Sequence, residues 1–103
     1  MISVPQLARM KPGAYVINAA RGGIVNEKDL YEALVSGHIA GAAMDASEVE
    51  PMTAENPLRT LDNVIITPHI GMYSKEAIGA VSLICAQNVA ACAVGEELRF
   101  QVV

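Results

Sequence analysis

Short, continuous apolar runs alternate with helical patterns along this chain. The runs at 14–18, 39–45 and 64–67 are too short for ordinary helices and are rich in Val, Ile and Ala, so they predict three strands. Because apolar and polar residues do not alternate within these runs, we expect a parallel sheet that is buried on both faces. The pattern indicates the α/β fold class.

Three other segments carry helical signals. Ser3 can cap a short helix through Met10, and Asn26 is a good N-cap for a helix through Val35. The third helix, 74–94, is apolar on nearly every side. We therefore expect other elements to cover it on more than one face.

Three strands make an incomplete parallel sheet, because the outer strands present unpaired edges. We therefore expect the chain to be part of a larger domain, and to self-associate or form a homo-oligomer. The connection 46–63 is rich in acids and prolines and is long for a compact domain. Loops of this length are usually functional or mobile.

The composition narrows the class of protein. Hydrophobic residues make up 52% of the 103 residues and charged residues 17%, which provides enough apolar surface for a core. The net charge is −4, and the seven basic residues are scattered along the chain. A nucleic-acid partner is disfavoured, since a module that binds one needs a positive face.

The cysteines and the apolar segments indicate the cellular compartment of the protein. Cys85 and Cys92 lie two helical turns apart, about 10 Å along the axis, which is too far for a disulfide. We interpret them as small, buried hydrophobic residues in a reducing compartment. The N-terminus shows no secretory pattern, and the stretch 78–94 holds polar residues such as Ser82 and Gln87, which favours a buried helix over a membrane span. These features predict a cytoplasmic chain with no membrane partner.

Chemically useful side chains follow each predicted strand. Arg21 follows the first strand and His69 follows the third, while Asp45 and Glu50 follow the second. Ligands of parallel α/β sheets gather at the carboxyl ends of the strands. We therefore expect these four side chains to converge on one edge of the sheet.

This set of residues suits redox chemistry between a carbonyl and an alcohol. A histidine can take up or release the proton, and a carboxylate beside it fixes its tautomer and stabilises its protonated form. An arginine binds a substrate carboxylate with two parallel hydrogen bonds. Simpler interpretations are a surface or ion-pair role for Arg21, a solvated acid for Glu50 and a loop cap for His69. Their joint placement favours the functional interpretation, and the acids lack the tight spacing of metal ligands, so no metal site is predicted.

The same segments resemble the D-isomer-specific 2-hydroxyacid dehydrogenase family. The resemblance runs over nearly the whole chain with the family's spacing, and it is carried by KPGAYVINAARGGIV (11–25), GAAMD (41–45), EP (50–51) and TPHIG (67–71). It implies that residues 1–94 form a partial Rossmann-like parallel sheet, the second half of a dinucleotide-binding domain. Residues 95–103 would then begin the return to a substrate domain that lies outside this sequence.

The resemblance also implies roles for individual residues. Arg21 would bind the substrate carboxylate and carbonyl, and His69 would be the acid/base. Glu50 would orient the His69 ring and stabilise its positive charge. The cofactor would be NAD, with NADP as an alternative. The residues that would contact it are Ala20, Arg21, Asp45, His69 and Gly71.

The sequence departs from the family's pattern in two places. It contains no G-x-G-x-x-G, so the turn that binds the pyrophosphate is missing. After the histidine, Gly71-Met72-Tyr73-Ser74 replaces a commoner Gly-Gly-Ser-Thr type of segment. This segment is similar to the branch that contains the C-terminal-binding-protein homologues.

These observations predict part of an NAD-dependent oxidoreductase. It would transfer a hydride between nicotinamide and the C2 atom of a D-2-hydroxy acid or 2-keto acid, its small-molecule partner, and the 103-residue chain alone would be inactive. Two alternatives stay open: an NAD(H)-sensing binding module of the C-terminal-binding-protein type, and a truncated chain with no activity of its own.

Overall fold

The computed structural model describes residues 1–101, and the chain divides into two compact units, residues 1–70 and the residues from Gly71 onward. The second unit holds one long helix, α3 (Lys75–Val94). The first unit contains, in chain order, α1 (Val4–Leu7), β1 (Ala14–Asn18), α2 (Glu27–Val35), β2 (Ile39–Met44), the 3-10 helix η1 (Pro57–Thr60) and β3 (Val64–Ile66).

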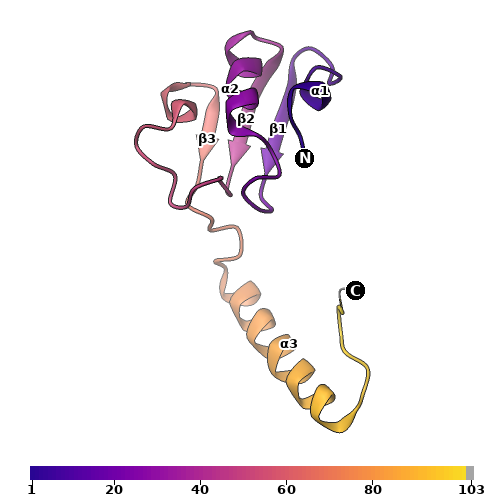
Figure 1. The fold of residues 1–103 in the computed structure, drawn as a ribbon. Coiled ribbons are helices and arrows are strands. Elements are labelled where there is room, and N and C mark those ends of the chain that lie inside the picture. The colour runs from indigo at the N-terminus through magenta and orange to yellow at the C-terminus, as the bar shows by residue number, and fades with distance from the viewer. Residues whose placement is uncertain (102–103) are drawn as a thin grey trace. The chain divides into compact units, whose positions relative to one another are not determined.

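The three strands form the predicted parallel sheet, in the order β1-β2-β3 (Figure 1). Val16 pairs with Ala42, and Met44 pairs with both Asn18 and Ile66. The carboxyl ends of all three strands therefore lie along one edge of the sheet. The α/β fold class is confirmed.

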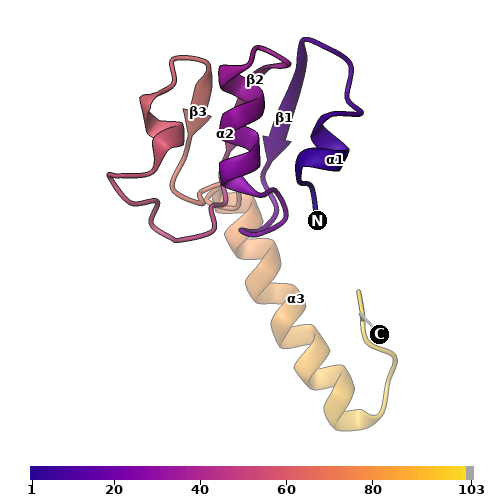
Figure 2. The ribbon, with the colours of Figure 1, turned by 45° about the horizontal axis from the view of Figure 1, so that its top comes forward.

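Helix α2 covers one face of the sheet (Figures 1 and 2). Its Leu30 and Leu34 are buried against the sheet. Each fully buried side chain of this size contributes about 1.5–3 kcal/mol relative to exposure, so this core is the main source of stability of the first unit. The buried core consists of Leu7, Val16, Val25, Leu30, Leu34, Ile39, Ala42, Met44 and Leu58.

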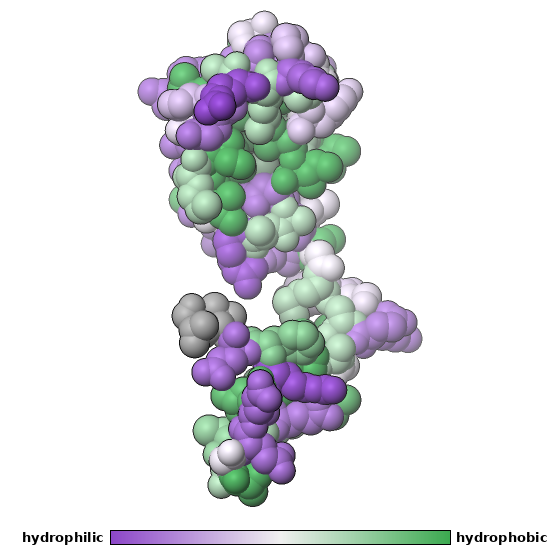
Figure 3. All heavy atoms as spheres, turned by 90° about the vertical axis from the view of Figure 1, so that its right-hand side faces the viewer, coloured by the Kyte–Doolittle hydropathy of each residue, from purple (hydrophilic) through white to green (hydrophobic). Residues whose placement is uncertain are grey.

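Within the first unit, the prediction that the sheet is buried on both faces is wrong. Tyr15, Ile17 and Ile65 point to the face opposite α2, and their exposed fractions are 73%, 76% and 68%. In Figure 3, the face of the first unit on the β1 side carries apolar side chains in its middle and polar ones at both ends. The apolar strand sequences predict an apolar environment on both faces, whereas the first unit itself supplies a covering helix, α2, for only one.

Local capping explains where the first two helices begin and end. Gln6 Oε1 accepts hydrogen bonds from the backbone and hydroxyl of Ser3, the predicted cap of α1. This helix ends at Leu7 rather than at the predicted Met10, because the next backbone groups form i→i+3 turns. Asn26 caps α2 as predicted, since its Oδ1 accepts from the backbone N–H of Asp29 at 2.9 Å.

The second unit is built around α3. The side chain of Ser74 caps its first turn by accepting from the backbone N–H of Ala77, and Gly95 ends the helix in the left-handed conformation with φ +73°. None of its side chains is buried in the described residues, so the predicted cover on several faces is not observed there. Cys85 and Cys92 are free, as predicted, but exposed rather than buried.

Helix α3 is also long and apolar enough to cross a membrane by length and composition alone. After it, the chain turns back, and the side chain of Asn88 exchanges two hydrogen bonds with the backbone of Arg99. The division into a domain ending at residue 94 and a return segment 95–103 stays a prediction. Residues 102 and 103 of that segment lie outside the described residues.

Candidate active site

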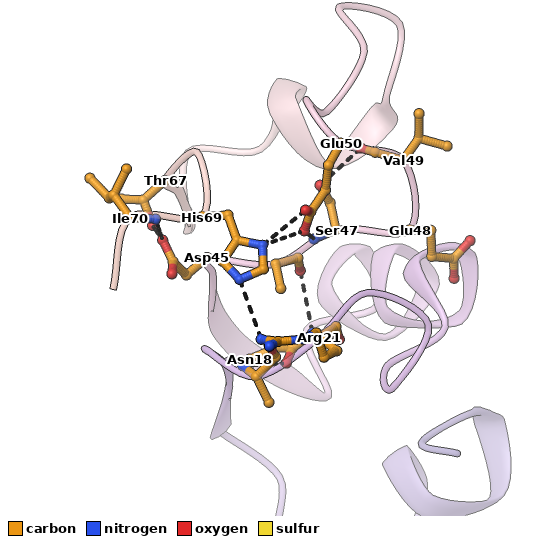
Figure 4. Close-up of polar contacts among 12 residues, drawn as sticks. Asn18, Arg21, Asp45, Ser47, Glu48, Val49, Glu50, Thr67, His69 and Ile70 are labelled. Carbon is orange, nitrogen blue, oxygen red and sulfur yellow. Dashed lines mark hydrogen bonds and ion pairs between the residues drawn. The ribbon is translucent and has the colours of Figure 1, made fainter. Parts of the chain in front are cut away.

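The predicted catalytic residues meet at the carboxyl edge of the sheet. Arg21 lies on the loop after β1, Glu50 on the loop after β2 and His69 on the loop after β3. Figure 4 shows the Glu50 carboxylate and the Arg21 guanidinium on opposite sides of the His69 ring. The topology predicted from the sequence thus brings together three residues that are 19 to 48 positions apart in pairs.

Glu50 and His69 are joined by a hydrogen bond, which is also an ion pair whenever the ring is protonated. His69 Nδ1 lies 3.0 Å from Glu50 Oε1 and 2.9 Å from Oε2, with side-chain exposed fractions of 31% for the histidine and 39% for the glutamate. The His69 backbone is left-handed, with φ +53°. Such a conformation is uncommon for a residue with a side chain and occurs preferentially at functional sites.

Arg21 contacts the other nitrogen of the same ring. Its Nη1 donates to the carbonyl of Ala20 at 2.7 Å and lies 3.5 Å from His69 Nε2. A carboxylate only accepts hydrogen bonds, so the proton between Glu50 and His69 is on Nδ1. A guanidinium only donates, so Nε2 accepts from Arg21. Nε2 is therefore the ring atom that is available to exchange a proton with a substrate.

Asn18 orders the loop that carries Arg21, although it is not among the predicted site residues. Its side chain is buried at the end of β1, where Nδ2 donates to the carbonyls of Arg21 (2.9 Å) and Ala46 (3.3 Å). Its Oδ1 accepts from the backbone N–H of Ala20 at 3.2 Å. An asparagine at the last position of an apolar strand was the available signal, because its side chain readily bonds to the backbone that follows.

Asp45 links the ends of β2 and β3. Its Oδ1 accepts from the Thr67 hydroxyl at 2.6 Å and from the backbone N–H of Ile70 at 2.9 Å (Figure 4). These bonds hold the two ends of the segment that contains His69. Ala20 and Asp45, two of the predicted cofactor contacts, thus lie in the loops around Arg21, Glu50 and His69, while Gly71 belongs to the second unit. All of these cofactor contacts stay predictions.

The surroundings of Glu50 favour its ionised form. The pKa of its carboxyl is lowered from the usual value by the hydrogen bond from His69, then by the backbone hydrogen bond from Ser47, and less by the charges of His69 and Arg21, with desolvation opposing. Because the folded-state pKa of Glu50 is lowered, its hydrogen bonds from His69 and Ser47 stabilise the folded loop at pH values above the ordinary glutamate pKa. This contribution is lost as the pH falls through the lowered value.

Replacing His69 with alanine is expected to raise the pKa of Glu50. The largest cause of the lowering is then removed, while the Ser47 backbone bond remains, so the pKa moves only part of the way to its ordinary value. Carboxyl ¹³C chemical shifts followed through an acid titration measure this change. Glu76 is the internal control, because its lowered pKa comes from its own backbone N–H and the Ser74 hydroxyl. An unchanged Glu50 titration would contradict the assigned contact.

The carboxyl edge also offers room and partners for a ligand. A groove beside His69 is lined by Asp45, Ser47, Glu50, Arg59 and Thr67. Among the described residues, no group of three or more His, Cys, Asp or Glu side chains is arranged to hold a metal ion. The arrangement can bind an anion through Arg21 and move a proton at His69 Nε2, with the Glu50 charge behind the ring.

Comparisons with known proteins point to one family. The family model described as D-isomer specific 2-hydroxyacid dehydrogenase, NAD binding domain, matches residues 1–71. The chain is also 46% identical, over 99 residues, to a D-3-phosphoglycerate dehydrogenase of Archaeoglobus fulgidus. That alignment covers 96% of this chain and 19% of the relative, so the chain spans about a fifth of the relative's length.

Solved structures show the same similarity in three dimensions. One is a D-isomer specific 2-hydroxyacid dehydrogenase of Xanthobacter autotrophicus Py2 in complex with NADPH and MES, with 37% identity and a TM-score of 0.86. The other is the NAD-complexed form of such an enzyme from Lactobacillus delbrueckii ssp. bulgaricus, with 35% identity and a TM-score of 0.77. Both similarities cover 99% of this chain, and respectively 41% and 35% of the solved chains.

Proposed function

This chain belongs to the D-isomer-specific 2-hydroxyacid dehydrogenase family, as part of its NAD-binding domain, and from that premise we propose that it carries the proton-transfer and carboxylate-binding residues of an NAD-dependent dehydrogenase. The substrates would be D-2-hydroxy acids and the corresponding 2-keto acids. The single observation that carries this proposal is the Glu50–His69–Arg21 cluster at the carboxyl edge of the sheet.

The residues present fit the nicotinamide end of a dinucleotide. The carboxylate of Asp45 can accept from the amide of the nicotinamide, and the Ala20 backbone and Arg21 lie on the neighbouring loop. When bound, the nicotinamide supplies or accepts the hydride at the C2 atom of the substrate. The chain lacks the glycine-rich turn that binds the pyrophosphate. We therefore propose that the 103 residues alone turn over no substrate.

The chain's own residues would bind the substrate and transfer the proton. Arg21 binds the substrate carboxylate with two parallel hydrogen bonds and so orients the C2 oxygen toward His69. In the reductive direction, protonated His69 donates the Nε2 proton to that oxygen, and in the oxidative direction neutral His69 removes it. Glu50 stays ionised throughout, holds the Nδ1 hydrogen and stabilises the ring when it is protonated.

A chimera tests this function. The matching 99 residues of the Archaeoglobus enzyme would be replaced by this chain, and the NAD-dependent activity of the host would be measured beside that of the 103-residue chain alone. We expect turnover from the chimera and none from the chain. A folded chimera that binds NADH without turnover would contradict the enzymatic role and would favour an NAD(H)-sensing module.

We further propose that the chain acts in the cytoplasm and associates with itself. Two features support self-association: β1 forms an edge of the described sheet with Ile17 exposed, and no side chain of α3 is buried.

Light scattering is expected to report a mass above 10.9 kDa. Ile17→Lys should weaken the association, because a charge on an edge strand disfavours pairing. Val49→Lys, on an exposed loop, is the control, and a 10.9 kDa species at high concentration would contradict the proposal.

A further inference from the structure

A buried carboxylate lies outside the candidate active site, at the start of α2. Glu27 is only 8% exposed, and each of its carboxylate oxygens accepts one hydrogen bond. Oε1 accepts from the backbone N–H of Glu48 at 2.6 Å, and Oε2 accepts from Nδ2 of Asn56 at 2.6 Å. A buried charge without partners is costly, so these two bonds are needed for the carboxylate to stay in place.

Both partners of Glu27 lie on the loop that carries Glu50. This site loop, residues 45–56, is held at Glu48 on one side of Glu50 and at Asn56 on the other. Two further bonds strengthen the two anchors. Glu48 Oε1 accepts from the backbone N–H of Glu27 at 3.1 Å, and Asn56 Oδ1 accepts from the backbone N–H of the fully buried Leu58 at 3.0 Å.

We propose that Glu27 is a positioning residue, which fixes the site loop at both ends so that Glu50 meets the ring of His69. In Figure 4, Glu48 points away from the ring while Glu50 points toward it, so the loop carries the anchor and the catalytic carboxylate on opposite sides. Glu27 has no contact with His69 and acts only through the loop. The proposal rests on the proposed function, in which Glu50 orients the acid/base.

A helix-capping role for Glu27 predicts a different outcome. An acidic residue in the first turn of a helix interacts favourably with the helix dipole, and Asp29 in the same turn has this property as well. If Glu27 served only α2, its replacement would lower helix stability and leave the Glu50–His69 contact unchanged. The two roles are therefore separated by a measurement at Glu50.

The first test is Glu27→Gln in the full 103-residue chain. Glutamine has one acceptor oxygen, so it can accept from Glu48 or from Asn56 but not from both, and its amide then faces a donor. We expect the site loop to loosen and the Glu50 carboxyl, which faces His69 and Arg21, to titrate closer to its ordinary pKa. Glu32→Gln makes the same change of charge at an exposed position of α2 and should leave the Glu50 titration unchanged.

A second variant restores the hydrogen-bond pattern with the acid and the amide exchanged. In Glu27→Gln/Asn56→Asp, the glutamine accepts from Glu48 and donates to the new carboxylate, which still accepts from Leu58. The net charge equals that of the original chain. We expect the double variant to show the original Glu50 titration. Asn56→Asp alone places two carboxylates together, so its Glu50 titration should differ from the original.

The Glu50 titrations test the positioning role of Glu27 without any measurement of turnover. An unchanged Glu50 titration in Glu27→Gln, or a double variant that fails to recover it, overturns the positioning role. If the single variants do not fold, the double variant alone decides, by its Glu50 titration. In the chimera, Glu27→Gln should lower kcat by up to roughly 100-fold with a smaller change in KM. An inactive chimera would overturn the proposed function, whereas the titrations would still test Glu27.

Discussion

Replacing His69 with asparagine is expected to lower kcat of the chimera by about 100- to 10,000-fold, the usual contribution of a positioned acid/base. Asparagine is close to the ring in size but cannot release or take up a proton. Arg21 is retained and still binds the substrate carboxylate, so KM should change much less than kcat. The measurement is steady-state oxidation of NADH with the keto acid of the host enzyme.

The other histidine of the chain is the matched control for this variant. His38 Nε2 lies 3.1 Å from the carbonyl of Leu7, between α1 and the end of α2, and has no place in the proposed chemistry. His38→Asn should therefore leave kcat unchanged. A His69→Asn enzyme with the original kcat would remove His69 from the mechanism. The assignment of acid/base chemistry to this edge would then be lost.

Replacing Gly22 with alanine is expected to damage both the fold and the activity. The added Cβ would overlap the carbonyl oxygen of Ser47 and lie 2.7 Å from its carbonyl carbon and 3.2 Å from the Cα of Glu48. Backbone atoms cannot rotate away, so one of the two loops must move, and these loops carry Arg21 and Glu50. Overpacking of this kind typically costs about 1–3 kcal/mol of unfolding free energy.

The activity should fall further than the stability alone requires. A displacement of about 1 Å in a catalytic group can cost roughly 100-fold in rate. The substitution affects both the loop that carries Arg21 and the loop that carries Glu50. Denaturant unfolding of the chain and kcat of the chimera measure the two effects. Gly79→Ala is the control, because a Cβ at this helical position meets no atom within 4 Å. It should leave kcat unchanged, and a Gly22→Ala variant with the original stability would disprove the close approach.

Local signals in the sequence predicted most of the elements. The cap Asn26 lies at the predicted position because an N-cap bond needs only neighbouring residues. The three apolar runs became three parallel strands, since residues of this type have few other ways to bury themselves between helices. The length of α1 was overestimated, because the sequence pattern does not distinguish α-helical from i→i+3 turns after Leu7.

The meeting of Arg21, Glu50 and His69 followed from topology as well. Parallel strands place their carboxyl ends on one edge, so residues after each strand converge whatever their separation in the sequence. Among the acids of the connection 46–63, the sequence pattern singled out Glu50 alone. The structure adds Glu48, whose side chain bonds to the backbone of Glu27. Glu27 and Glu48 are 21 residues apart in the sequence, so no local pattern could predict their contact.

By itself, the sequence determined the caps of the first two helices, the three strands and their parallel arrangement, because each depends on residue type and on neighbours within a few positions. Only the tertiary structure decided which face of the sheet is covered, how closely Gly22 approaches Ser47, and that Glu27 holds the loop of Glu50. These features depend on the distances between loops that are far apart in the chain. Side chains and backbone meet there only after the apolar core has closed, so their pairing is a consequence of packing rather than of any local pattern.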